Sequence, residues 1–373
     1  MAFEFLATEL VLHVFYSCDS IADVFNLSQT CRRFYAIFNA SQRIPILANA
    51  AEAEYGPTHE IIQLVTQNTS QPAHNIRNAN MSLSLLKQIL QVGRVAKKWE
   101  EIYPIKKWKV DYENRRVLDR LERFHLRRAI YRLWLYSRAF HSPSFPRTSR
   151  SVPLVIRERA ELLHNWSSNE LAEMEDVRLI MRDVVQHHIC PSNGTIQRKF
   201  HKRFPDSTNS LLFNIHLNYH PSPSSRVYSN GHSTSEPLFF NARSSHEKQA
   251  IDQNSALLNK YATKFRSDLY HEPGLQGWGD EIPHYYIVED MLKLDPSQIL
   301  WLRENTLLKE QVERYVESIG EWFENNGETF AQTLEWVINE RGEDAVAFRE
   351  AVVGGDLGIA GVVERSHEGR FIL

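Results

Sequence analysis

The sequence has few cysteines, few glycines and no long apolar run. Only three cysteines, Cys18, Cys31 and Cys190, occur in 373 residues, which is typical of a protein that works without disulfides in a reducing compartment. Glycine and proline number 15 each, too few for a collagen-like or low-complexity chain. No apolar run approaches the ~18 residues of a membrane span. The first lysine or arginine is Arg32, so a secretory signal is not expected either. We therefore expect a cytoplasmic or nuclear protein with no membrane partner.

The residues that are present predict an all-α protein. Apolar residues make up 42% of the chain and charged residues 24%, as in ordinary globular proteins. Strand signals are scarce, and only Ser210–Leu217 and Val352–Ile359 would allow a strand. Helical periodicity is clear over Glu113–Phe140, which contains neither glycine nor proline.

Local signals predict where several helices begin and end. Ser167 and Glu170 have the spacing of a capping box, and Pro191 should stop the helix that follows them. Asp295 before Pro296 reads as an N-cap followed by proline at the first helical position.

Composition divides the chain into four regions. Residues 3–45 form a compact apolar unit, and residues 46–204 and 251–365 have helical patterns that we expect to pack together. Residues 205–250 between them are rich in serine, histidine and proline, which predicts a flexible linker or loop.

Charge is distributed unevenly although the net charge is only −3. Residues 94–157 hold 17 lysines and arginines against 6 acidic residues, a net of +11, whereas residues 268–350 hold 6 against 19, a net of −13. The basic block allows a nucleic-acid surface, but no RNA- or DNA-reading motif accompanies it. We expect instead that the basic helix lies near the acidic C-terminal helices.

The first forty residues predict three short helices, with Thr8, Ser20 and Ser28 as their caps. Their apolar surface exceeds what so small a bundle can bury, which points to a partner. The stretch contains Leu6-Ala7-Thr8-Glu9-Leu10, Val14-Phe15, Val24-Phe25-Asn26-Leu27 and Thr30-Cys31-Arg32-Arg33-Phe34. In this order and spacing it resembles an F-box, with Ala7 where the family has proline.

The resemblance implies a function and a set of contact residues. An F-box docks on the Skp adaptor of a Skp–cullin–F-box ubiquitin ligase, and the rest of the chain holds a protein substrate for ubiquitination and degradation. Segments such as Trp322–Phe330 also resemble fungal F-box proteins with an all-helical C-terminal region of unknown function. By this resemblance the partner-binding residues are expected to be Leu6, Ala7, Leu10, Phe15, Val24, Leu27 and Arg32. The loss of the family proline at Ala7 is expected to weaken docking.

No motif predicts catalysis, a cofactor or a metal. His187, His188 and Cys190 lie close in sequence, but their spacing fits a helix end better than a metal site. Four aromatic residues that could line a pocket are expected in the core: Trp278, Tyr285, Tyr286 and Trp301.

The sequence therefore predicts a small F-box and a larger irregular helical domain, acting as a non-catalytic substrate receptor. Two alternatives stay open. One is a helical enzyme with an unrecognised site, and the other is a nucleic-acid-binding protein that uses residues 94–157. Repeats of the leucine-rich, WD or kelch type are absent, so no substrate class is indicated.

Overall fold

The computed structural model describes residues 6–40, 42–68, 70–113, 115–203, 277–279, 281–306, 308–323 and 327–359. These residues form fifteen α-helices and no strand, which confirms the all-α prediction. The predicted linker 205–250 and the possible strand Ser210–Leu217 lie outside the described residues. The other possible strand, Val352–Ile359, was wrong, because it forms the end of a helix and a turn.

The helices fall into two compact units. The first unit takes in the described residues up to Ile180, residues 295–297 and those from Thr329 onward. It holds α1 (Thr8–Tyr16), α2 (Ile21–Ser28), α3 (Arg32–Asn39), α4 (Arg43–Tyr55), α5 (Thr58–Val65), α6 (Leu83–Lys107), α7 (Arg120–Phe140), α8 (Pro153–His164), most of α9 (Ser168–Val184), α16 (Phe330–Glu340) and α17 (Ala345–Gly354).

The second unit comprises the described parts of residues 181–294 and 298–328. It holds a π-helical turn (Val185–Ile189), α10 (Asn193–Arg203), α13 (Glu281–Met291), most of α14 (Pro296–Asn305), α15 (Lys309–Ile319) and a 3₁₀ turn (Glu321–Phe323). Predicted regions 46–204 and 251–365 each contribute helices to both units. The subdivision of the chain into the four predicted regions stays a prediction.

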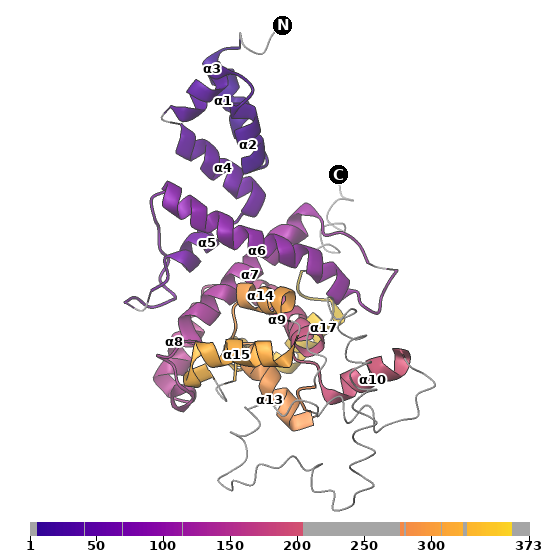
Figure 1. Cartoon of the computed structure of the whole chain (residues 1–373). Coiled ribbons are helices and arrows are strands. Elements are labelled where there is room, and N and C mark those ends of the chain that lie inside the picture. The colour runs from indigo at the N-terminus through magenta and orange to yellow at the C-terminus, as the bar shows by residue number, and fades with distance from the viewer. Residues whose placement is uncertain are drawn as a thin grey trace, which may run out of the picture. The chain divides into compact units, whose positions relative to one another are not determined.

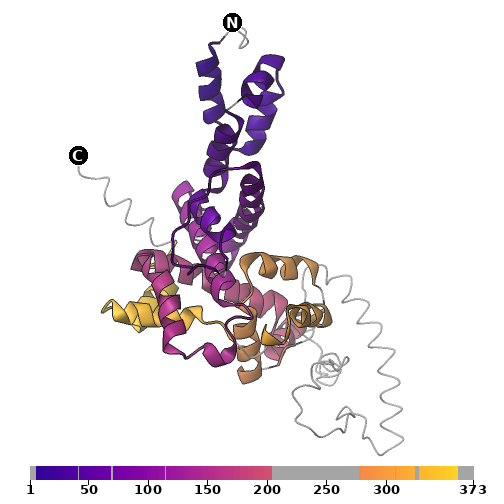
Figure 2. The same ribbon diagram turned by 90° about the vertical axis from the view of Figure 1, so that its left-hand side faces the viewer.

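Helix α4 joins the N-terminal helices to the rest of the first unit. Helices α1, α2 and α3 all pack on α4, and α4 packs in turn on α6, an arrangement that can be followed in both views (Figures 1 and 2). Tyr55, at the end of α4, lies against Gly93 of α6. The Tyr131 hydroxyl of α7 donates a hydrogen bond of 2.8 Å to the Tyr55 carbonyl. The end of α4 is therefore held by two helices of the body.

Helix α7 begins later than the sequence pattern predicts. The periodicity suggests a start at Glu113, but the helix starts at Arg120, after a capping box. The Glu122 amide donates to Asp119 Oδ1 at 2.8 Å, and the Asp119 amide donates to the Glu122 carboxylate at 2.9 Å. These reciprocal bonds satisfy amides that an earlier start would have placed inside the helix.

The other predicted boundaries are found in the structure. Ser167 and Glu170 form the expected reciprocal bonds before α9, and the helical segment ends at Ile189, before Pro191. Asp295 Oδ1 accepts a hydrogen bond from the Ser297 amide at the start of α14. These signals act between residues two or three positions apart, which is why sequence alone suffices to locate them.

Asp176 fastens the segment after α17 to α6. Its buried carboxylate accepts hydrogen bonds from the Tyr103 hydroxyl at 2.6 Å and the Ile359 amide at 3.1 Å, and it pairs with Lys107 at 2.8 Å. Gly358 has a φ of +103°, and a Cβ there would lie 2.8 Å from Asp176 Oδ2. Glycine is therefore required at this close approach.

The close approach of α4 and α6 gives a stability prediction. A Cβ at Gly93 would lie 2.3 Å from Tyr55 Cδ1, so Gly93→Ala should destabilise the protein by ~1–3 kcal/mol through overpacking. Without Tyr55 the same change would stabilise a helix interior by ~1 kcal/mol, so the sign of the effect is diagnostic. Urea unfolding followed by circular dichroism measures it. The control is Gly354→Ala, whose nearest neighbour is 3.7 Å away and which should be neutral or stabilising. Unchanged stability in Gly93→Ala would contradict the packing.

Candidate partner-binding site

Two of the three N-terminal helices begin at a side-chain cap. The Ser20 hydroxyl accepts a hydrogen bond from the Asp23 amide and caps α2, as predicted. Helix α3 is capped by Cys31, whose Sγ accepts from the Phe34 amide at 3.4 Å, rather than by Ser28. Helix α1 has no side-chain cap: Ala7 holds the cap position, and Thr8 is its first helical residue.

The bundle has a core of its own that rests on α4. Its fully or nearly fully buried apolar side chains are Val11, Phe15, Ile21, Val24, Phe34 and Phe38. The Phe15 ring lies 6.2 Å from the Phe34 ring and 5.8 Å from the Phe38 ring, measured between centroids. Phe15 is thus the residue around which α1 and α3 meet.

This core corrects two of the seven expected contact residues. Phe15 and Val24 are 0% exposed, so they stabilise the bundle and present no surface to a partner. Leu6 and Leu27 are half-buried, and Ala7 and Arg32 are exposed. Whether these residues bind a partner stays a prediction.

An apolar stripe remains exposed on α1. Leu10 is 51% exposed and Val14 37% exposed, and their spacing of four residues puts them on one side of the helix. Phe25 and Tyr35 are also exposed, at 38% and 59%, and were not among the expected contact residues. Phe25 follows the buried Val24, and Tyr35 follows the buried Phe34. Successive residues of a helix are rotated by about 100°, so the sequence could have distinguished these two residues from the core.

One arginine ties the chain before α1 to α3. Arg33 Nη2 donates a hydrogen bond to the Leu6 carbonyl. Since Arg33 belongs to the Cys-Arg-Arg-Phe element and Leu6 to the Leu-x-x-x-Leu element, this bond brings the two sequence elements of the resemblance into contact.

Glu54 links the bundle to the body of the first unit. Its carboxylate accepts a hydrogen bond of 3.0 Å from the Ile21 amide at the start of α2, and its other oxygen pairs with Lys97 of α6 at 2.6 Å. Burial alone would raise the pKa of Glu54, but the hydrogen bonds from Lys97 and Ile21 outweigh it and lower the pKa. Three helices therefore meet at one ionised carboxylate.

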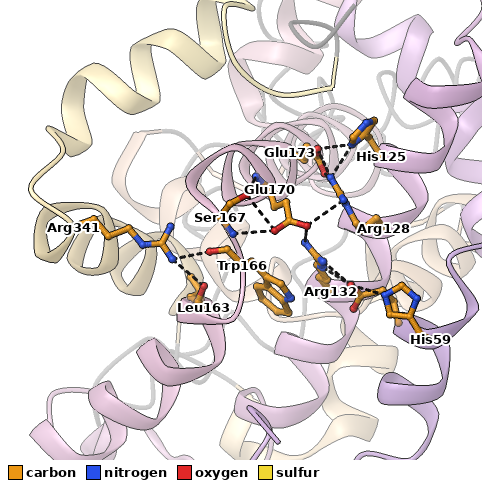
Figure 3. A network of polar contacts seen from close by, with 11 residues as sticks. His59, His125, Arg128, Arg132, Leu163, Trp166, Ser167, Glu170, Glu173 and Arg341 are labelled. Atoms are coloured by element: carbon orange, nitrogen blue, oxygen red, sulfur yellow. Dashed lines mark hydrogen bonds and ion pairs between the residues drawn. The ribbon is translucent and has the colours of Figure 1, made fainter. Parts of the chain in front are cut away.

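Several basic residues of the block 94–157 are paired inside the first unit, and Figure 3 shows two of them, Arg128 and Arg132. Arg128 lies 3.1 Å from Glu170 and 2.6 Å from Glu173, both on α9. Arg132 lies 2.6 Å from Glu60 of α5 and 3.0 Å from Glu170. Five side chains from three helices thus form one partly buried network.

These pairs change the interpretation of the charge pattern. Among the described residues, the carboxylates that neutralise α7 come from α5, α6 and α9, and the structure shows none from the acidic C-terminal helices. Where α7 contacts the start of α16, the Tyr136 hydroxyl lies 2.9 Å from Thr329 and 3.0 Å from Thr333, and its ring lies 5.2 Å from the Phe330 ring. A nucleic-acid surface would need these arginines in solvent, so the network weakens the alternative based on residues 94–157.

The histidine and cysteine cluster lies at a helix end in the second unit. His187 Nδ1 lies 3.0 Å from the Asp183 carbonyl, and His284 Nε2 lies 2.8 Å from the Cys190 carbonyl. Burial raises the pKa of the Cys190 thiol far above its usual range, which makes it unreactive. Within the described ranges, no group of three or more histidine, cysteine or acidic side chains is placed to hold a metal.

The expectation that four aromatic residues lie in the core was wrong for three of them. Trp278 is 8% exposed, but Tyr285, Tyr286 and Trp301 are 51%, 59% and 47% exposed. Trp301 stacks on Tyr315 with ring centroids 5.1 Å apart. Helical periodicity does not distinguish such a surface stack from a core contact.

Comparison of the chain with protein-family models, with curated proteins and with solved structures found no match. The resemblance to an F-box therefore rests on the residues of the N-terminal bundle alone. In the part of the chain that the structure describes, no helix is both long enough and apolar enough to cross a membrane.

The network of Figure 3 predicts a pH-dependent contribution to stability. Burial would raise the pKa of Glu170, but the hydrogen bond from Ser167 and the charges of Arg132 and Arg128 lower it below its usual value of 4.5. A carboxylate with a lowered pKa stabilises the fold above the unfolded-state value and loses this contribution as pH falls through the lowered pKa. Glu170→Gln should therefore cost ~1–3 kcal/mol at pH 7 and progressively less below pH 4.5.

Urea titrations of wild type and Glu170→Gln at neutral and acid pH measure this difference. Glu101, exposed on α6, provides the control, because Glu101→Gln should stay within ~0.5 kcal/mol of wild type at both pH values. A cost for Glu170→Gln that does not change with pH would disprove the ionised role of Glu170.

Proposed function

We propose that the chain is a substrate-receptor subunit of a Skp–cullin–F-box ubiquitin ligase, in the cytoplasm or nucleus. Its N-terminal bundle binds a Skp-type adaptor and, through it, a cullin. Its helical remainder binds a protein substrate for ubiquitination and degradation. The chain itself performs no chemistry in this proposal.

The observation that carries the proposal is the exposed face of α1. The three short helices bury an aromatic core of their own and still leave Leu10 about half exposed. Exposed apolar side chains one turn apart on a helix, as Leu10 and Val14 are, are typical of protein interfaces. They lie in the segment whose residue order resembles an F-box, so an adaptor is the partner that fits best.

The attachment of the bundle supports the same function. A ubiquitin-ligase receptor acts by proximity: it raises the effective concentration of substrate lysines near a charged conjugating enzyme. That effect is larger when the adaptor-binding end is fixed relative to the substrate-binding part. Glu54 and Tyr55 attach the bundle to α6 by direct contacts, so α4 is a packed connection and not a free linker.

The adaptor contact is tested by removing the apolar stripe while keeping the core. Leu10→Ser with Val14→Ser should lower the affinity for a Skp-type adaptor by about thirtyfold or more, because a desolvated anchor contributes over ~2 kcal/mol. Phe15 is left intact, because its removal would unfold the bundle. Isothermal calorimetry with the purified adaptor measures the affinity, and circular dichroism verifies folding.

The matched control for this double variant is Leu154→Ser, a 73% exposed leucine on α8, which should bind the adaptor like wild type. Equal affinities for wild type and a folded double variant would remove the α1 face from the proposal. No binding of wild type itself would remove the adaptor function.

Ala7 provides a test in the opposite direction. Its φ is −59° and its ψ 149°, a φ that proline adopts without strain. Ala7→Pro should therefore leave the fold intact and strengthen adaptor binding, since the family has proline at this position. Calorimetry against the same adaptor measures the change. A folded Ala7→Pro variant with weaker binding would show that α1 does not dock in the F-box manner.

A further inference from the structure

The connection between α6 and α7 displays an unusual set of apolar side chains. Figure 1 shows it extending outward beyond the two helices. Five large apolar residues within 17 positions are exposed: Ile105 by 56%, Val110 by 81%, Tyr112 by 71%, Val117 by 86% and Leu121 by 46%. Scattered exposed apolar residues are normal, but a concentration of this kind marks an interaction site.

The connection is anchored, so these side chains are held outward. Trp108 and Leu118 are buried, at 9% and 4% exposed. Arg115 Nη2 donates to the Trp108 carbonyl at 3.2 Å, and the Arg116 guanidinium lies 5.1 Å from the Trp108 ring centre and pairs with Glu122. A segment that buries two apolar residues and still exposes Val110 and Val117 presents them in a prepared arrangement.

The same segment carries positive charge. Residues 105–123 hold seven lysines and arginines and four acidic residues, a net of +3. Arg115 and Arg123 donate hydrogen bonds to the backbone carbonyls of Trp108 and Asp119. A backbone carbonyl carries no net charge, so these bonds do not neutralise the two guanidinium groups. Arg120 is exposed beside them. Positive charge is therefore exposed here beside apolar side chains, in contrast to the paired arginines of Figure 3.

We propose that this connection binds an anionic phospholipid surface. The apolar side chains would enter the interfacial layer, where valine and tyrosine are accommodated, and the arginines would contact lipid phosphates. An outward-projecting tip fits a bilayer interface without a matching recess, which a protein partner would have to supply. This proposal departs from the expectation of no membrane partner. It needs no spanning helix, because the connection would lie on the membrane surface. It does not depend on the proposed ligase function.

Vesicle sedimentation with the full chain tests the proposal. The chain should sediment with vesicles of phosphatidylcholine and phosphatidylserine in equal parts, and at least about fivefold less with phosphatidylcholine alone. Binding should weaken as NaCl screens the charges. Val110→Ser with Val117→Ser, and separately Arg120→Gln with Arg123→Gln, should each reduce binding at least about threefold.

The matched control is Ile76→Ser, which removes an 84% exposed apolar side chain elsewhere and should bind like wild type. Equal binding to both vesicle types, no binding, or full binding by either double variant would overturn the proposal. Soluble polyglutamate serves as the probe for an acidic protein partner. If polyglutamate binds the wild-type chain but neither double variant, and vesicles do not bind, the surface is a site for an acidic protein and the lipid proposal fails.

Discussion

The pairing of the arginines of α7 with carboxylates from three other helices is the constraint on which the body of the first unit depends. Arg127 pairs with Glu100 of α6, Arg128 with Glu173 of α9, and Arg132 with Glu60 of α5. Buried pairs of this kind add little net stability, because desolvation offsets the attraction, but losing one partner leaves a buried charge that is costly. Their effect is therefore to exclude other arrangements. A shift of α7 by one turn would separate each arginine from its carboxylate.

This internal pairing decides how the charge blocks along the chain should be understood. A net of +11 over residues 94–157 would suggest a strongly basic surface if each side chain faced solvent. Some of the acidic partners lie outside the block, as Glu60 on α5 and Glu173 on α9 do, whereas Glu100 lies within it. These pairs neutralise part of the block's charge within the fold. Positive charge stays exposed beside apolar side chains at the α6–α7 connection, where Arg115, Arg120 and Arg123 are not held in that network. The internal pairs reduce the long-range attraction that the block would exert on nucleic acid.

The same kind of interaction attaches the N-terminal bundle. Glu54 receives the first amide of α2 and the ammonium group of Lys97, so one carboxylate satisfies a helix end and a cation of the body together. Nearby, Gly93 allows Tyr55 to approach α6 more closely than any other residue would. The ion pair of Glu54 and the close packing of Tyr55 act at neighbouring residues, and together they fix the orientation of α4 relative to α6. Such a connection matters for the receptor function that we propose, because motion at the joint would lower the effective concentration of the substrate.

Local signals in the sequence were sufficient for helix boundaries but not for the candidate site. Ser20, the Ser167–Glu170 pair and Asp295 were predicted because a cap depends on residues two or three positions away. The start of α7 was missed because apolar periodicity continues through Val117 and Leu118, although the chain there is not helical. Phe15 and Val24 were assigned to a partner because periodicity identifies an apolar face without saying what covers it. In three short helices, a core position and a contact position can differ by a single residue, as Val24 and Phe25 do. Only the packing of α4 and of the phenylalanine rings decides between them, and that packing joins residues more than ten positions apart. That packing also leaves Leu10 and Val14 exposed, because the core of the bundle is complete without them.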